Sequence, residues 1–376
     1  MVRPPFCPHR ECSAHYRRPG FRWWVHRGFY HTRLNGPVPR FGCRLCGRGF
    51  SAQTFSIDYY AKRRVDYHRL IGLQSSCAGV RQIARQLGVS CGTVENKTMR
   101  FARQALSAHI ELTERLPLAE DVCADGLQSY WVSQYVPNNI TVLAGAGSRF
   151  LYHWNGASLR RGGAMRPGQR RRRTALERRF RADPDALTQC FTDICEQLCR
   201  LIGHSPRAAL TRLDTDRHSA YRRALSAHGP WQLLLAAGRV AHRRTSSRAR
   251  RSAANPLAPV NTIDRQIRID LAEHVRETVR FARNPNHCME RFTVWAWAYN
   301  YRKRYLINQP LGDTTTHAQA AGMDAGRIAA VCGDLTRRRR FLSHTPIAGE
   351  VRRIWLRMME RPFQSGQEYL PRYLLA

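Results

Sequence analysis

The sequence predicts a mixed α/β fold in which a five-stranded sheet with flanking helices follows two small N-terminal modules. Three observations support this prediction. Two close pairs of cysteines flank an aromatic stretch near the N-terminus, a helix–turn–helix pattern follows, and short β-branched and aromatic runs then alternate with helical patterns. The expected domains are residues 1–56, 57–115 and 116–308, with a helical, basic tail over residues 309–376.

Length and charge restrict the class of protein. A chain of 376 residues can bury a core in two or three domains, and a formal charge of +35 calls for a polyanionic partner, of which nucleic acid is the obvious one. Almost all the cations are arginines, which a GC-rich coding sequence also favours, so arginine clusters carry more weight than the total. No segment is apolar enough to span a bilayer or to form a secretion signal. We therefore expect a cytoplasmic, nucleoid-associated protein without a membrane partner.

The cysteine spacing near the N-terminus predicts a structural zinc site. In a reducing compartment the twelve cysteines would be thiols or metal ligands, and only four of them have ligand spacing. Two knuckles, "CPHREC" and "CRLC", flank a hairpin-like aromatic stretch, which is the outline of a zinc ribbon, and Zn²⁺ favours four soft tetrahedral ligands. The wider first knuckle leaves open a different ligand set that includes His9 or His15. The expected ligands are Cys7, Cys12, Cys43 and Cys46.

The segment "IARQLGVSCGTVENK" predicts a helix–turn–helix. Ala84 is the small residue where two helices cross, Gly88 opens the turn, Ser90 caps a second helix that reaches about Ala105, and Val94 anchors it. An ordinary helical hairpin is the alternative. Four residues on the exposed face of the second helix are expected to meet the major groove: Thr93, Asn96, Lys97 and Arg100.

The remaining elements follow in an order typical of ribonuclease-H-like folds. Three strands are expected in residues 121–155, then a helix over 183–203, a strand over 208–216, a helix over 219–229, a strand over 231–237 and a long helix from about Asn261. Residues 239–260 form an insertion before that last helix. Cys190, Cys195 and Cys199 are expected to be small buried residues, and the aromatic run over 295–305 is expected to pack in the core.

Three isolated aspartates fall where this order would bring them to one end of the sheet. Asp125 lies in the first, central strand, Asp216 just past the fourth strand, and Asp264 on the final helix. Clustered carboxylates repel one another unless cations join them, so the pattern predicts two bound Mg²⁺ or Mn²⁺ ions for phosphodiester chemistry. The competing acids are Asp121 for the first position, Asp214 for the second, and Asp270, Glu273 and Glu277 for the third.

Arginine clusters flank these acids. The Gly-rich start of residues 160–173 predicts a flexible loop that orders on DNA, and the insertion would place further cations beside the acids. The run "RRRR" at residues 337–340 fits DNA binding and an ordinary solvated charged surface equally well. The arginines expected to contact DNA phosphates are Arg160, Arg161, Arg170, Arg171, Arg172, Arg173, Arg243, Arg244, Arg265 and Arg268.

Taken in order, these motifs together with "ADGLQSYWVSQY", "LDTDRHSAYRRAL" and "NTIDRQIRIDLAEHVRETVRFARN" resemble bacterial insertion-sequence transposases of the DDE/DDD class. The resemblance covers Cys7 to about Tyr305. It implies cleavage and strand transfer of double-stranded DNA, at element ends and target, without a covalent protein intermediate, and by analogy a homodimer on DNA. The family pattern "N-x-x-E-R" appears here as "NTIDR", which implies an Asp-Asp-Asp variant or an inactive copy.

Two other functions account for part of the same pattern. A sequence-specific DNA-binding regulator would use the zinc ribbon and the helix–turn–helix and would keep the acids only for structure. A ribonuclease-H-like nuclease that processes RNA would use the acids on a different polymer.

Overall fold

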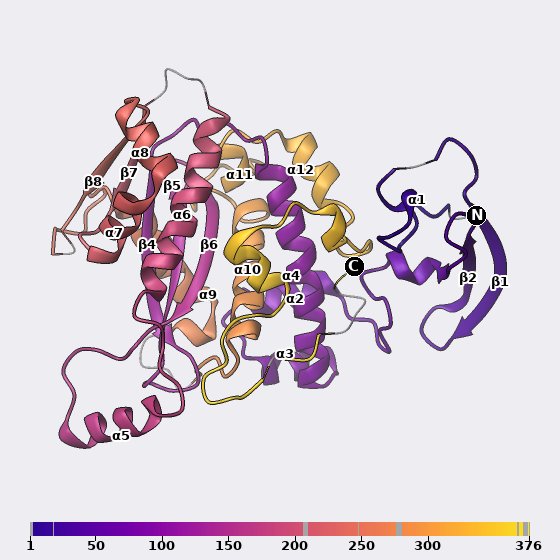
Figure 1. Cartoon of the computed structure of the whole chain (residues 1–376), viewed down its shortest axis with the longest axis horizontal. Helices are drawn as coiled ribbons and strands as arrows, with labels where there is room; N and C mark the ends of the chain where they lie inside the picture. The colour runs from indigo at the N-terminus through magenta and orange to yellow at the C-terminus, as the bar shows by residue number, and fades with distance from the viewer. Residues whose placement is uncertain are drawn as a thin grey trace.

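The structure is a computed structural model and describes residues 3–17, 19–205, 210–246, 248–275, 280–366, 368–370 and 375. Its N-terminal module, an antiparallel three-stranded sheet of order β1-β2-β3, lies at one end of the molecule's long axis (Figure 1). The predicted hairpin between the cysteine pairs is therefore present. The elements of this module are α1 (Ser13–Tyr16), β1 (Trp24–Thr32), β2 (Gly36–Cys43), β3 (Gly49–Ser51) and the 3₁₀ helix η1 (Ala52–Phe55).

Three helices follow, α2 (Tyr67–Gln74), α3 (Val80–Leu87) and α4 (Cys91–Thr113). The turn between α3 and α4 has the predicted form. Gly88 adopts a left-handed conformation with φ 63°, where glycine avoids the Cβ clash, and the Ser90 hydroxyl caps α4 by accepting from the Thr93 N–H. Ala84 and Val94 are buried between the helices. The α4 helix is longer than expected and runs through the middle of the molecule (Figure 1).

A mixed five-stranded sheet forms the main body, in the order β6-β5-β4-β7-β8. The first three strands in sequence form an antiparallel meander. β7 then pairs with β4 in parallel, and β8 pairs with β7 in parallel. This connectivity places β4 at the centre, as the sequence predicted. The strands are β4 (Val122–Tyr130), β5 (Pro137–Gly145), β6 (Leu151–Ser158), β7 (Thr211–Thr215) and β8 (Val240–Arg244).

Both faces of the sheet are covered by helices. In β4, Val122 and Ala124 face one hydrophobic core and Cys123 and Leu127 face the other, which is the two-residue alternation of a strand buried on both sides. The first face packs against α6 (Ala186–Gly203), α7 (Ser219–Ala227) and α8 (Gly229–Ala236), and the second against α9 (Ala258–Asp270). A basic helix, α5 (Pro167–Glu177), projects away from the body (Figure 1).

The C-terminal part packs against the rest of the chain. Helix α10 (Pro285–Tyr301) lies along α4, and its aromatic run is buried, as expected. Residues 337–341 return to the N-terminal module, where the Ile57 N–H donates to the Arg337 carbonyl at 3.0 Å and the rings of Phe6 and Phe341 lie 5.0 Å apart. The other elements are η2 (Ala272–His274), α11 (His317–Ala320), α12 (Ala325–Cys332), η3 (Leu342–His344) and α13 (Gly349–Trp355).

The predicted fifth strand over residues 231–237 is wrong. This segment is part of helix α8, which begins after the cap residue His228 with Pro230 in its first turn. Trp231 is buried, whereas Leu233 is 74% exposed, so the apolar run does not serve as a buried strand. The fifth strand is β8, which lies within the segment 239–260 that the sequence analysis assigned to an insertion.

Two further expectations are corrected. The loop predicted over residues 160–173 contains the first part of α5, because Pro167 and a capping Gln169 begin a helix after the glycines. The long final helix begins at Ala258 and ends at Asp270, where Leu271 adopts an extended conformation. Cys190 and Cys195 are buried and Cys199 is half-buried in α6, in agreement with an apolar role. No helix among the described residues has the length and apolarity needed to cross a bilayer.

Candidate functional site

Four cysteines gather in the N-terminal module as the sequence predicted. Their Sγ atoms all lie within 4.8 Å of one another, and three of the four residues are buried. The Cys7–Cys46 and Cys12–Cys43 Sγ distances are both 3.7 Å. A tetrahedron with Zn–S bonds of about 2.3 Å has edges of about 3.8 Å, so the cluster could bind a structural zinc ion without rearrangement. His15 Nδ1 donates to the Cys7 carbonyl at 2.6 Å and Nε2 lies 2.7 Å from the Ser343 hydroxyl, so this histidine is not part of the cluster.

The helix–turn–helix presents a smaller surface than predicted. Lys97 and Arg100 are buried, so the expectation that they lie on an exposed face is wrong. The Lys97 ammonium pairs with Asp58 at 2.5 Å, and Arg100 donates to the Ile57 carbonyl at 2.8 Å. Neighbouring segments cover α4 from Lys97 onwards. Thr93 and Asn96 are half-buried in its first turns and remain at the surface.

Three elements position the predicted acids on one side of the sheet. Cys123 of β4 pairs with Asp214 of β7 in parallel register. Two residues after Cys123 comes Asp125, and two residues after Asp214 comes Asp216. The α9 helix packs on the β4–β5 face through Val260, Ile263 and Ile267, and Asp264 belongs to the same side of the helix. The register thus brings Asp125 and Asp216 to neighbouring positions on β4 and just past β7, and Asp264 lies on the side of α9 that packs against β4 and β5.

Electrostatics show that these carboxylates share one environment. Burial raises the pKa of the Asp125 carboxyl from 3.8 to about 6, and repulsion from Asp216 adds to the rise, whereas the Gly126 N–H, which donates to Asp125 Oδ1 at 2.7 Å, opposes it. The Tyr221 hydroxyl lies 3.4 Å from Asp125 Oδ1. Burial raises the pKa of this phenol, and the charges of all three aspartates raise it further. Tyr221 thus stays a neutral hydrogen-bond donor to Asp125.

The competing acids have other partners. Arg243 binds both oxygens of buried Asp214, at 2.6 and 2.8 Å. Asp121 accepts from the Arg212 N–H and side chain, and Asp270 accepts from Trp295 Nε1 at 2.9 Å. Glu273 pairs with Arg291. Glu277 lies outside the described residues. Asp216, by contrast, accepts from the His218 N–H, and its charge raises the pKa of Asp125.

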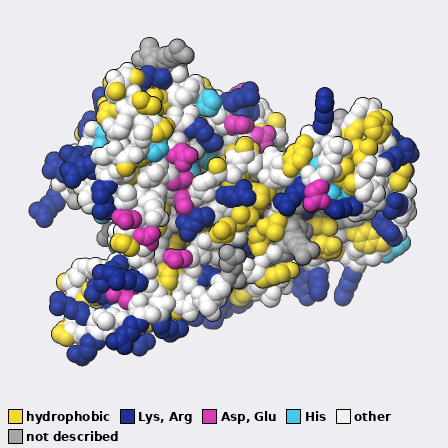
Figure 2. All heavy atoms as spheres, in the orientation of Figure 1, with side chains coloured by type: hydrophobic (Ala, Val, Ile, Leu, Met, Phe, Trp, Pro, Cys, Tyr) yellow, Lys and Arg dark blue, Asp and Glu magenta, His cyan; other side chains and the backbone are white. Residues whose placement is uncertain are grey.

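The predicted DNA-contacting arginines fall into two groups. Some are held within the protein: Arg243 by Asp214, Arg160 by both oxygens of Glu177, and Arg268 by the His274 carbonyl. Arg161 donates to Gln134, and Arg173 donates to the Arg161 carbonyl. The others are exposed, and those on α5 cover the projecting lobe with positive charge (Figure 2). This exposed group consists of Arg170, Arg171, Arg172, Arg244 and Arg265.

A second set of side chains, Glu273, His274 and Cys288, also brings ligating atoms within 4.8 Å of one another. These side chains already satisfy each other and their neighbours. Arg291 pairs with Glu273, Ser129 lies 2.9 Å from His274 Nδ1, and Cys288 Sγ lies 3.8 Å from His274 Nε2. This set and the four cysteines are the groups of this kind in the described part of the chain. The three aspartates are not such a group, so ions that bridge them would have to draw the carboxylates closer together.

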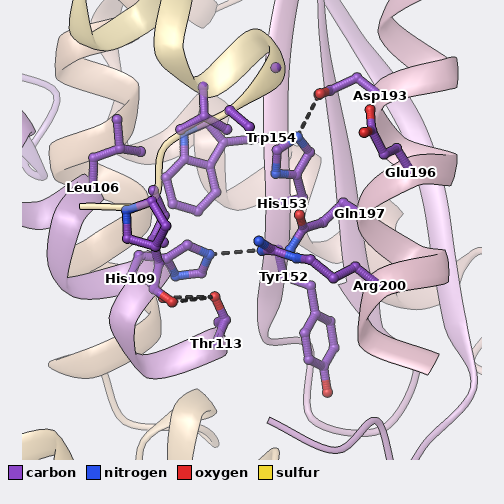
Figure 3. A pocket seen from close by; sticks show the side chains of 15 residues that line it. Leu106, His109, Thr113, Tyr152, His153, Trp154, Asp193, Glu196, Gln197 and Arg200 are labelled. Carbon is purple, nitrogen blue, oxygen red and sulfur yellow. Dashed lines mark hydrogen bonds and ion pairs between the residues drawn. The ribbon is translucent and has the colours of Figure 1, made fainter. Parts of the chain in front are cut away.

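Figure 3 shows a cavity of about 130 Å³ between α4, β6, α6 and the segment that leads to α13. His153 Nε2 and Asp193 Oδ2 point toward one another at 2.6 Å, and His109 Nε2 lies 3.0 Å from the Tyr152 carbonyl. Burial lowers the pKa of His109 to about 4, so this imidazole is neutral. None of the three aspartates lines the cavity, and its imidazoles have partners within the protein, which makes it part of the packing.

No protein-family model and no curated protein sequence matches this chain. The site is therefore defined by its geometry. Sequence reasoning missed Tyr221, although it follows Asp216 by five residues in "TDRHSAY" and lies in the first turn of the helix that His218 caps. Its role depends on the packing of α7, because the first turn of that helix directs the phenol toward β4.

Proposed function

We propose that the protein is a metal-dependent DNA transposase whose catalytic domain has a ribonuclease-H-like fold. The observation that carries the proposal is that the Tyr221 hydroxyl bonds Asp125 while the charges of Asp125, Asp216 and Asp264 all act on the same phenol. The mixed sheet with a central β4 and helices on both faces supports the fold assignment. A zinc-ribbon-like module and a helix–turn–helix supply two further elements suited to DNA.

The acids fit divalent cations by their chemistry. Carboxylate oxygens are the ligands that Mg²⁺ and Mn²⁺ prefer, and a half-buried Asp125 repelled by Asp216 is stabilised as an anion when a cation joins the two. When bound, two such ions lower the pKa of the attacking hydroxyl group and stabilise the leaving oxygen. Asp125, Asp216 and Asp264 would hold them, and Tyr221 would orient Asp125 through its hydroxyl hydrogen bond.

The reaction is phosphodiester hydrolysis followed by transesterification. Water attacks phosphorus, the P–O3′ bond breaks, and the strand keeps a 3′-hydroxyl. That hydroxyl then attacks a phosphorus of the target, a new P–O3′ bond forms, and a target 3′-hydroxyl leaves. The protein chain binds the strands and holds the acids, and no protein side chain becomes covalently attached.

A groove lined by several arginines runs along the same elements and supports a strand-shaped substrate, although Asp125, Asp216 and Asp264 are not among the residues that line it. Its volume is about 840 Å³, and its lining includes Gln128, which follows Asp125 on β4, His218, which follows Asp216, and Arg268, one turn after Asp264. Each element that carries an acid thus also contributes to this groove. Arg160, Arg161 and Arg223 line it as well. They contact Glu177, Gln134 and Asp185 in the structure, so DNA phosphates would have to replace these partners to gain the non-specific affinity that such contacts supply.

A cleavage assay tests the proposal. The full-length protein is incubated with Mn²⁺ and a plasmid that carries the DNA flanking the gene on both sides. We expect nicking at the element ends and joined products, and we expect Asp125→Asn, Asp216→Asn and Asp264→Asn to reduce both to background. Asp270→Asn is the matched control, since Asp270 lies on the same helix but is bound by Trp295 and Lys303. Equal activity of parent and acid variants would refute the mechanism.

A DNA-binding regulator is the second candidate, because the cysteine module and the helix–turn–helix are formed independently of the acids. It predicts specific binding of the parent and the acid variants alike, with no cleavage under any divalent ion. Cleavage restricted to RNA or RNA–DNA hybrids would instead identify an RNA-processing enzyme.

A further inference from the structure

A groove of about 900 Å³ lies between the N-terminal module and the C-terminal segment that returns to it. The Phe6–Phe341 ring contact and the hydrogen bond from Ile57 to Arg337 fix the two sides relative to each other. Arginines and tyrosines from segments far apart in the sequence line it, and among the described residues the lining contains no aspartate or glutamate, although Arg48 pairs with Glu11 at 3.0 Å. These residues are Arg27, Arg40, Arg48, Arg339, Tyr30, Tyr59 and Tyr60.

The arginines of the module are directed into the groove by its strands. A bulge interrupts the β1–β2 pairing between His26 and Phe29, and Gly28 within it has φ +72°, so the strand turns the Arg27 side chain across the sheet. The guanidinium lies over Gly42, where an added Cβ would come within 2.7 Å of Cζ. Arg40 is exposed on β2, opposite Ser51. The position of Arg27 therefore depends on the absence of a side chain at residue 42.

The tyrosines form a stacking surface on the other side. The rings of Tyr59 and Tyr60 are stacked with centroids 4.2 Å apart, and the Arg339 guanidinium lies 5.5 Å from the Tyr59 ring centroid. Tyr60 is 68% exposed and has φ 57°, in the left-handed region that a large side chain rarely adopts. Strained backbone of this kind is retained where it positions a functional group.

A polyanion with flat apolar groups matches this combination, because arginines bind phosphates and an exposed aromatic face stacks on bases. In a duplex the bases are stacked inside the helix and cannot reach Tyr60. We infer that this groove binds single-stranded DNA, with its phosphates along Arg27 and Arg40 and an unstacked base on the ring of Tyr60. The groove is separate from the three aspartates, so the inference does not rest on the proposed catalysis.

Fluorescence anisotropy with labelled oligothymidine of about 12 nucleotides, a length within the range of such sites, tests this inference. The full chain is used without added divalent ions, so cleavage does not affect the result. We expect Tyr60→Ala to weaken binding by about 5- to 150-fold, the range measured for loss of one stacked base, and Tyr60→Phe to bind like the parent. Arg27→Ala with Arg40→Ala should weaken binding and reduce its dependence on salt.

Tyr369→Ala is the matched control, since Tyr369 is 82% exposed and does not line the groove. Unchanged zinc content and thermal midpoint establish that each variant is folded. Equal affinity of Tyr60→Ala and Tyr369→Ala would overturn the inference. An equal loss of affinity for duplex and single strand in the Tyr60→Ala variant would also overturn it, and would assign the groove to duplex phosphates. Because the acid variants keep these arginines and tyrosines, failure of cleavage leaves this test unaffected.

Discussion

Replacing Asp125 by asparagine should stabilise the protein while it abolishes catalysis. Burial and Asp216 raise the pKa of Asp125 from 3.8 to about 6, and at ~1.4 kcal/mol per pKa unit the charged form costs about 3 kcal/mol at neutral pH. Asparagine keeps an oxygen for the Gly126 N–H and removes the charge. We expect a gain in the free energy of unfolding of about 1–3 kcal/mol at pH 7.5, because active-site groups often reduce stability.

The sign of the pH dependence follows from the direction of the shift. A carboxyl whose pKa is raised by folding reduces stability as pH rises from 3.8 through about 6, and has no effect when it is protonated in both states. The gain from Asp125→Asn should therefore be full above pH 7 and shrink to about 0.5 kcal/mol at pH 4. Urea unfolding followed by tryptophan fluorescence, without added Mg²⁺ or Mn²⁺, measures it.

Asp214→Asn is the control of opposite sign. Asp214 is 2% exposed and is bound at both oxygens by Arg243, so its replacement should destabilise the protein. If Asp125→Asn is neutral or destabilising at pH 7.5, or if its effect does not change between pH 7.5 and 4, Asp125 does not have the raised pKa that burial and, to a lesser extent, Asp216 give it. The convergence argument would then fail.

Three other predictions concern the rest of the molecule. The parent should contain close to one zinc ion per chain by elemental analysis and Cys12→Ser close to none, because the 3.7 Å Sγ distances match a tetrahedral site; a zinc-free parent would contradict this. Lys97→Met should destabilise the protein by about 3 kcal/mol in urea unfolding, since it leaves the Asp58 carboxylate without its ammonium partner; an unchanged midpoint would argue against the buried pair. Burial lowers the pKa of His109 from 6.5 to about 4, so its stabilising contribution is present above pH 6.5 and is lost as pH falls, by about 2 kcal/mol at pH 5. His109→Gln should reduce that acid sensitivity in thermal unfolding, and an identical pH profile would show that His109 is not the group responsible.

The helix–turn–helix illustrates how far local pattern reaches. The turn at Gly88, the cap at Ser90 and the buried Ala84 and Val94 were predicted correctly, because each depends on backbone conformation within a few residues. The exposure of Lys97 was predicted wrongly, because it depends on Asp58, which comes from another segment. The residues around a lysine in a helix do not indicate whether a segment far away in the sequence will cover it and supply a carboxylate partner.

The segment that follows α7 shows the same limit for secondary structure. An apolar run such as "WQLLLAA" fits a buried strand or a helix, and the sequence gives no period that separates them. The choice was decided by packing, since Trp231 fills the core while Leu233 stays exposed, and β8 takes the sheet edge beside β7.

The sequence by itself determined the cysteine cluster, the turn of the helix–turn–helix, the central position of β4 and the three candidate aspartates. Spacing along the chain is enough for these, because ligand pairs, caps and strand order are local or sequential properties. Only the tertiary structure decided which arginines are held by carboxylates and carbonyls, that Tyr221 reaches Asp125, and that Arg27 and Tyr60 line one groove. Those features depend on contacts between segments far apart in the chain, and the direction of each side chain is set only when the elements pack.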